Sequence, residues 1–160
     1  MLKYLNTQVT FAEIPNEIIL CINITNCPCH CKGCHSPYLA EDIGEELTFD
    51  VLLYLCNIEC KGISCVCFMG GDSDPSYVNK LAEVIRESDL SIKTAWYSGR
   101  QELSDKIDLK NFDYIKLGPY IEEKGPLNNP NTNQKLYEVC KISKLPPKFI
   151  LKDITNKFWK

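Results

Sequence analysis

Four short apolar runs, each closed by a cysteine-rich or glycine-containing turn, restrict most strongly what this chain can fold into. The runs span residues 14–24, 63–69, 92–97 and 112–117. They are rich in β-branched and aromatic side chains and have the length of buried strands. Helical patterns follow the first two runs, because Thr48 can cap one helix with an apolar face, and Asp74 with Pro75 is typical of the start of another. Strands that alternate with helices favour parallel βαβ units.

The length of the chain limits the architecture. A complete eight-unit barrel needs about 250 residues, whereas this chain has 160, of which 44% are hydrophobic and 24% charged. We therefore predict one α/β domain over residues 1–160, built as a partial (β/α) barrel with a mostly parallel sheet or as an open α/β sheet. Residues 149–158 are expected to add an edge strand and a short aromatic anchor. Residues 125–133 form either a lid or a plain surface connection.

Loops that follow the carboxyl ends of parallel strands build the functional site in both architectures. Four segments fall on this predicted rim: the cysteine loop at residues 26–35, Gly70-Gly71-Asp72, Ser98-Gly99 and Gly118-Pro119. A pair of glycines lets the backbone approach a ligand closely, and a carboxylate after it can attract an ammonium group. The second segment therefore predicts a ligand-binding turn.

Charge and hydropathy exclude two classes of partner. The formal net charge is -3, and the 18 basic residues are scattered along the chain, so no basic stripe is available to follow a phosphate backbone. No apolar run approaches the roughly 20 residues that a membrane-spanning helix needs, and residues 1–6 lack the apolar core of a signal peptide. We expect a cytoplasmic protein that binds neither nucleic acid nor membrane.

Ten cysteines are many for a cytoplasmic protein of this size, and three of them have an informative spacing. Cys27, Cys31 and Cys34 stand as C-x3-C-x2-C in a polar loop broken by proline and glycine. Thiolates favour iron–sulfur clusters, zinc or copper(I). A four-iron cluster on three thiolates leaves one iron open to a substrate, whereas structural zinc needs a fourth ligand. Cys29, His30 or His35 could supply that ligand, so zinc remains an alternative at this point.

The remaining cysteines suggest packing rather than a second metal site. Cys56 and Cys60 are four residues apart on an expected helix, and Cys65 and Cys67 point to one face of an expected strand. A second metal site on these four is conceivable. Small apolar packing is favoured, because strand cysteines beside valine and phenylalanine behave as small hydrophobic residues.

The cysteine loop also resembles a known family. The segment Cys27-Pro28-Cys29-His30-Cys31-Lys32-Gly33-Cys34-His35 is similar to the signature of the radical S-adenosylmethionine (SAM) superfamily. Within it, Gly33-Cys34-His35, Gly70-Gly71-Asp72 and residues 118–123 resemble the activating proteins of anaerobic ribonucleoside-triphosphate reductase. Residues 132–134 and 153–155 resemble them too, so the similarity covers nearly the whole chain. Many superfamily members have an aromatic residue before the third cysteine, and the glycine here narrows the resemblance to the reductase-activating branch.

This resemblance implies cofactors and site residues. Cys27, Cys31 and Cys34 would hold a [4Fe-4S] cluster, whose open iron binds the amino and carboxylate groups of SAM. One electron from the cluster would then split the sulfonium to give a 5′-deoxyadenosyl radical. The residues implied in SAM binding are Gly33, Cys34 and His35 beside the nucleoside, Gly70, Gly71 and Asp72 at the methionine end, and Ser98 at the methionine or ribose end.

The same resemblance implies an activity and partners. The chain would be an oxidoreductase that generates a glycyl radical on anaerobic ribonucleoside-triphosphate reductase, with a low-potential electron donor such as flavodoxin or ferredoxin. Two alternatives stay open. One is a radical enzyme with another substrate, such as an activator of a formate-lyase type of glycyl-radical enzyme. The other is a non-catalytic zinc or iron–sulfur binding module.

Overall fold

Four parallel strands form the centre of the sheet in the computed structural model, which describes residues 1–59 and 61–159. They are β2 (Ile19–Ile24), β4 (Cys65–Met69), β5 (Lys93–Tyr97) and β6 (Tyr114–Leu117). Each lies inside one of the four predicted apolar runs, so all four predicted strands are confirmed. The first run begins its strand late, because Asn16 has a positive φ of 67° and the Glu17 amide closes a turn onto the Ile14 carbonyl.

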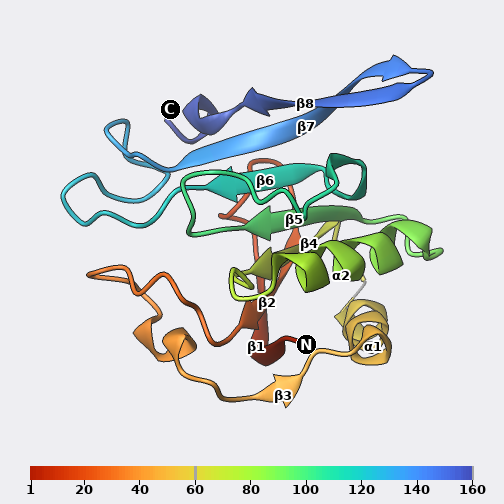
Figure 1. Cartoon of the computed structure of the whole chain (residues 1–160), viewed down its shortest axis with the longest axis horizontal. Helices are drawn as coiled ribbons and strands as arrows, with labels where there is room; N and C mark the ends of the chain where they lie inside the picture. Colours follow the sequence, from red (N-terminus) through yellow and green to blue (C-terminus); the bar gives the residue numbers. More distant parts are fainter. Residues whose placement is uncertain (60, 160) are drawn as a thin grey trace.

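Antiparallel strands flank the parallel centre on both sides (Figure 1). They are β1 (Lys3–Thr10), β3 (Glu45–Glu46), β7 (Lys135–Lys144) and β8 (Pro147–Asp153). The order across the sheet is β3-β1-β2-β4-β5-β6-β7-β8. The protein is therefore an α/β fold with an eight-stranded mixed sheet that does not close into a barrel. The mostly parallel partial (β/α) barrel is not confirmed, and the open-sheet alternative describes the fold.

Two α-helices begin at the residues that the sequence predicts. In α1 (Phe49–Glu59), the Thr48 hydroxyl accepts a hydrogen bond from the Val51 amide at 3.2 Å. In α2 (Pro75–Glu87), the Asp74 side chain accepts from the Tyr77 amide at 3.1 Å. Such caps satisfy amide groups that have no partner inside the helix. Between β5 and β6 the described chain forms only the 3-10 helix η2 (Leu109–Asn111), so the expected alternation of strands and helices stops there.

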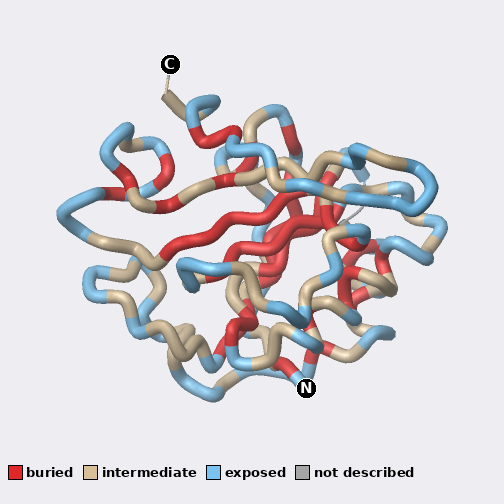
Figure 2. The backbone as a smooth tube through the Cα atoms, turned by 45° about the horizontal axis from the view of Figure 1, so that its top comes forward, coloured by how far each residue is buried: buried red, intermediate tan, exposed pale blue. Residues whose placement is uncertain are grey.

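The central strands are buried on both faces, and Figure 2 shows them as the most buried part of the chain. On one face, Leu20, Ile22, Phe68, Trp96 and Ile115 pack with residues of both helices. The opposite face is called the inner face here. Alternate residues of the same strands form it, and their neighbours come from turns near both ends of the chain. The inner-face core contains Cys21, Cys65, Cys67, Ala95, Tyr97, Ile14, Leu127 and Ile154.

The buried cysteines divide between the two cores. Cys65 and Cys67 are fully buried on the inner face, which confirms that they pack as small apolar groups. Burial raises the pKa of Cys65 and Cys67 above the usual value, so both remain neutral thiols. Cys56 belongs to α1 and is buried in the core on the other face of the sheet. Cys60, which the sequence analysis paired with it, lies outside the described residues.

The parallel strands end at one edge of the sheet, and this edge carries the predicted rim segments.

Among the described residues, no helix is long and apolar enough to cross a membrane.

Candidate metal and cofactor site

The cysteine loop leaves the carboxyl end of β2 and folds back over the edge of the sheet. Two backbone bonds hold its base: the Asn26 amide donates to the Glu41 carbonyl at 3.0 Å, and the Cys27 amide donates to the Leu39 carbonyl at 2.9 Å. Positive φ angles at Asn26 and His30 turn the chain sharply within the loop. These turns direct three thiols toward one cavity.

Cys27, Cys31 and Cys34 are partly buried and line a cavity of about 640 Å³. This volume lies within the range of small-molecule and cofactor sites, roughly 300–1,000 Å³. The Ser36 amide donates a hydrogen bond to the Cys34 sulfur at 3.5 Å. Amide hydrogen bonds to cysteine sulfur are among the contacts that tune iron–sulfur clusters. The loop thus presents soft donors, a hydrogen bond to sulfur and open space on one side.

Most of the predicted site residues meet at this cavity. Its wall includes His35, Gly70, Asp72 and Ser98 together with the three thiols, so segments from the ends of β2, β4 and β5 converge as predicted. Gly71 and Gly33 are not part of the wall. Gly71 is packed beneath it, where a Cβ atom would lie 2.6 Å from a Val78 methyl group. Gly71 therefore serves helix packing behind the turn.

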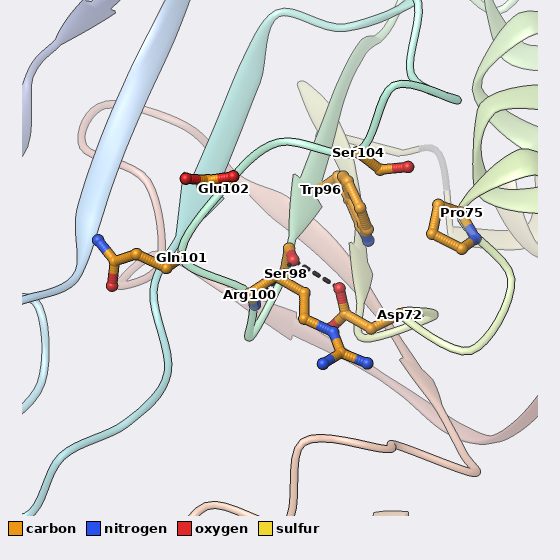
Figure 3. Close-up of a pocket in the computed structure, with 8 residues that line it drawn as sticks. All are labelled: Asp72, Pro75, Trp96, Ser98, Arg100, Gln101, Glu102 and Ser104. Atoms are coloured by element: carbon orange, nitrogen blue, oxygen red, sulfur yellow. Dashed lines mark hydrogen bonds between the residues drawn. The ribbon is translucent and has the colours of Figure 1, made fainter.

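Asp72 follows β4, is buried, and is held by the segment that follows the neighbouring strand β5 (Figure 3). Its Oδ1 accepts from the Ser98 hydroxyl at 2.5 Å, and its Oδ2 accepts from the Gly99 amide at 2.9 Å. Charge-assisted bonds of this kind fix the orientation of a carboxylate. Ser98 thus has two roles at the cavity. It orients Asp72, and it forms part of the wall itself.

A second, smaller cavity of about 430 Å³ borders the other side of this pair. Asp72 and Ser98 line both cavities, and Figure 3 shows them between Pro75 at the start of α2 and the side chain of Arg100. Arg100 is exposed, and its amide donates to the Ser98 hydroxyl at 3.0 Å. The Asp72–Ser98 pair therefore separates the two cavities and forms part of the wall of each.

Cys29 points toward Asp72 and not into open solvent. Its sulfur lies 3.7 Å from Oδ2 of Asp72, and a Cβ atom added to Gly99 would lie 2.8 Å from that sulfur. Burial first, and then the Asp72 charge, raises the pKa of Cys29 to about 12. Cys29 is therefore set against the aspartate in the wall of the cavity.

Residues after β6 lie over the cysteine loop near Gly33. A Cβ atom at this glycine, whose φ is +76°, would lie 3.2 Å from the Glu122 carboxylate and 3.4 Å from the Tyr120 ring. The His35 and Tyr120 rings are tilted against each other with their centroids 5.3 Å apart. Both the backbone conformation and the lack of space therefore favour glycine at position 33. This contact closes the cavity on one side.

Lys116 in β6 is a wall residue that the sequence analysis missed. Only 8% of it is exposed, and its ammonium donates to the carbonyls of Ser98 at 3.1 Å and Gly118 at 2.7 Å. No ion pair joins it to an acidic side chain among the residues that the structure describes. Burial lowers its pKa, although Asp72 and the loop thiols oppose that shift. A lysine inside the apolar run 112–117 was the available signal.

The chemistry of the donors fits an iron–sulfur cluster with a ligand beside it. Three thiols offer the soft ligands that such clusters use, and Asp72 and Lys116 add one charge of each sign to the same wall. An amino acid group carries the complementary pair of charges. Over residues 1–59 and 61–159, no group of three or more His, Cys, Asp or Glu side chains is placed to hold a single metal ion.

Comparisons with protein-family models, with curated proteins and with solved structures find no significant match to this chain.

Proposed function

We propose that this protein is a radical SAM activating enzyme that generates a glycyl radical on anaerobic ribonucleoside-triphosphate reductase. One observation carries the proposal: the three thiols of the C-x3-C-x2-C loop share a cavity with Asp72 and Ser98, which follow the next two parallel strands. A ligand site at the carboxyl ends of parallel strands is the usual arrangement in α/β folds. The resemblance of the loop to the radical SAM signature supplies the chemistry.

In this proposal Cys27, Cys31 and Cys34 hold a [4Fe-4S] cluster. When bound, the cluster would supply one electron to the sulfonium of SAM, which separates into methionine and a 5′-deoxyadenosyl radical, and that radical would take a hydrogen atom from a glycine of the reductase and leave as 5′-deoxyadenosine. The protein's own side chains orient the sulfonium substrate. They also shield it from water, since the contact between the residue 120–122 loop and the cysteine loop covers one side of the cavity.

The two charged side chains of the wall would bind the methionyl end of SAM. Asp72 is fixed by Ser98 and Gly99, so its carboxylate would accept the ammonium group without having to be ordered first. Lys116 has three N–H groups and uses two of them on backbone carbonyls, which leaves one for a carboxylate. Cys34 and His35 would lie beside the nucleoside, where Gly33 allows the Tyr120 loop to close.

The exposed side of the cysteine loop would receive the electron donor. Lys32 is exposed in this loop, next to the proposed cluster ligand Cys31. A flavodoxin or a ferredoxin could therefore approach the cluster from solvent without entering the cavity.

Anaerobic assays test the proposal in two stages. The first incubates the reconstituted protein with a reductant and SAM, and measures methionine and 5′-deoxyadenosine, which should form in equal amounts. The second adds the anaerobic reductase from the same source and measures its glycyl radical by electron paramagnetic resonance. SAM cleavage without a glycyl radical would reject the reductase as the substrate. If the protein is colourless, holds zinc tightly and does not cleave SAM, the proposal that it is a radical SAM enzyme is rejected.

A further inference from the structure

One polar side chain in the wall of the main cavity has no role in the site described above. Gln134 lies in this wall and is 7% exposed. Its backbone amide donates to the Thr132 hydroxyl at 3.1 Å, but its side-chain amide makes no hydrogen bond within the part of the chain that the structure describes. Within the described residues, the buried polar side-chain atoms that lack a hydrogen-bond partner are Thr94 Oγ1 and Asn133 Oδ1, so the Gln134 amide still reaches the space of the cavity. It can therefore donate to and accept from a ligand that enters there.

The strand order places Gln134 far from the cysteine loop. The loop follows β2, Asp72 follows β4, Ser98 follows β5, Lys116 lies in β6, and Gln134 leads into β7. Lys116 pairs with Leu136, and Gln134 lies on the same face because it is two residues before Leu136. A Cβ atom on Gly118 would lie 3.1 Å from the Gln134 Cα, so this residue is at the rim and not deep in the sheet.

The neighbours of Gln134 along the wall are mostly apolar. Leu127 and Phe158 line the same cavity, and both pack against the inner-face core. Pro126 and Asn128 are also in the wall and are exposed, so the cavity reaches solvent at this end. A mostly apolar passage that offers the Gln134 amide, with the exposed Asn128 at its mouth, suits a ligand that is itself an amide with few side-chain atoms.

A carboxamide and a peptide unit complement each other. The side-chain NH₂ can donate to a main-chain carbonyl while the side-chain oxygen accepts from a main-chain N–H. Glycine-containing segments expose both groups, because no side chain covers them. A lone sugar hydroxyl or a purine edge would also bind an amide, but SAM would already be held at the other end of the cavity by Asp72.

We propose that Gln134 recognises the main chain of the glycine-containing segment of the partner protein, and so forms the entrance subsite for that segment. The inference rests on the proposed function, since it assigns this subsite to the protein substrate of the same cavity. Gln134 does not touch the reacting atoms in this arrangement. It fixes the depth and direction of the entering segment.

The test compares Gln134→Leu with Gln101→Leu. Gln101 is an exposed glutamine that lines the smaller cavity only, so it controls for the loss of an amide. With the anaerobic reductase as substrate, Gln134→Leu is expected to raise KM at least tenfold, because the two hydrogen bonds that it loses together contribute at least the roughly 1.4 kcal/mol of a tenfold change. Its affinity for SAM, measured by calorimetry, should stay within twofold of the wild type. Gln134→Glu, which keeps the acceptor and loses the donors, should show a smaller rise in KM.

Two results would overturn the inference while leaving the proposed function standing. Equal KM values for Gln134→Leu and Gln101→Leu would show that the amide does not contact the reductase. Weaker SAM binding by Gln134→Leu would assign the amide to the nucleoside instead. Failure of the wild-type protein to cleave SAM is a separate outcome, which would overturn the proposed function and this subsite with it.

Discussion

Lys116 carries a positive charge into the cavity without an acidic partner among the described residues. Its ammonium donates to two carbonyl oxygens and lies over the Tyr97 ring, 5.9 Å from the centroid. These contacts leave its charge uncompensated, so burial costs it hydration free energy. An anion bound beside the lysine would offset this loss of hydration free energy. Both candidate anions, the carboxylate of SAM and a cluster with thiolate ligands, belong to the proposed site.

Replacing Lys116 by methionine tests this reasoning. Lys116→Met removes the charge and keeps an unbranched side chain of similar length. We expect SAM affinity to fall tenfold or more, because a charge-assisted hydrogen bond contributes about 1.5–3 kcal/mol. The cluster midpoint potential should also become more negative, since the loss of a nearby cation disfavours the added electron. Calorimetry and a redox titration measure the two effects.

Lys110→Met is the matched control, because the Lys110 side chain is exposed in η2 and, among the described residues, forms an ion pair only with Asp108, two residues before it. An unchanged SAM affinity and potential in Lys116→Met would contradict the role of this charge. The free energy of unfolding should not decrease in Lys116→Met, since a buried charge is replaced by an apolar group.

At the scale of elements, the cysteine loop allows the three proposed cluster ligands to be told apart from Cys29 by experiment. All four cysteines of the loop line the cavity, but the Cys29 sulfur lies 3.7 Å from the Asp72 carboxylate, and no such contact holds Cys27, Cys31 or Cys34 in the described part of the chain. Substitution of any of the first three by alanine should abolish the iron–sulfur absorption after anaerobic reconstitution. Cys29→Ala should retain most of it. Loss of the cluster in Cys29→Ala alone would show that the ligand assignment is wrong.

The central elements were predictable because they carry strong local signals. The four parallel strands are continuous apolar runs, and both helices begin at capping residues, Thr48 and Asp74. The flanking strands are different. β1 is half polar, and β7 becomes exposed along its second half, so neither shows the apolar run of a strand that is buried on both faces. Their stability depends on pairing with β2 and β6, which a local pattern does not reveal.

The same distinction applies to the candidate site. Convergence of the cysteine loop, Gly70, Asp72 and Ser98 follows from one rule about the ends of parallel strands, so the sequence predicted it. Lys116 and Gln134 depend on cross-strand neighbours and on which face of the sheet is covered. The turns that cover the inner face come from distant parts of the chain, and no local pattern indicates where they pack.

At the scale of the whole molecule, Glu17 ties the N-terminal segment to the starts of three central strands. Its buried carboxylate accepts from the Ser64 hydroxyl at 2.5 Å, from the Tyr114 hydroxyl at 2.9 Å, and from Lys93. Burial alone would raise the pKa of Glu17, but hydrogen bonds from these three partners hold it below the usual value. Glu17 and its three partners lie at the end of the sheet opposite the cavity.

Glu17→Gln should therefore lower the free energy of unfolding by about 2 kcal/mol at neutral pH, the cost of losing charged hydrogen bonds. Because the folded state lowers the pKa of Glu17, its contribution is fully present above the unfolded-state pKa of about 4.3 and is lost as pH falls through the folded-state value. Urea denaturation at several pH values measures the difference. Glu87→Gln, at an exposed position on α2, is the control, and a pH-independent difference would contradict the argument.

The open sheet has a consequence for how such a protein can evolve. In a closed barrel, the number and tilt of the strands set the width of the interior. Here the outer end of the cavity is bounded by the loop with Leu127 and by the short 3-10 helix η3 (Thr155–Phe158), while strand ends hold the inner end. Loops tolerate insertions and substitutions better than strands do. This end of the cavity can thus be remodelled for a different ligand while the thiols and Asp72 keep their positions.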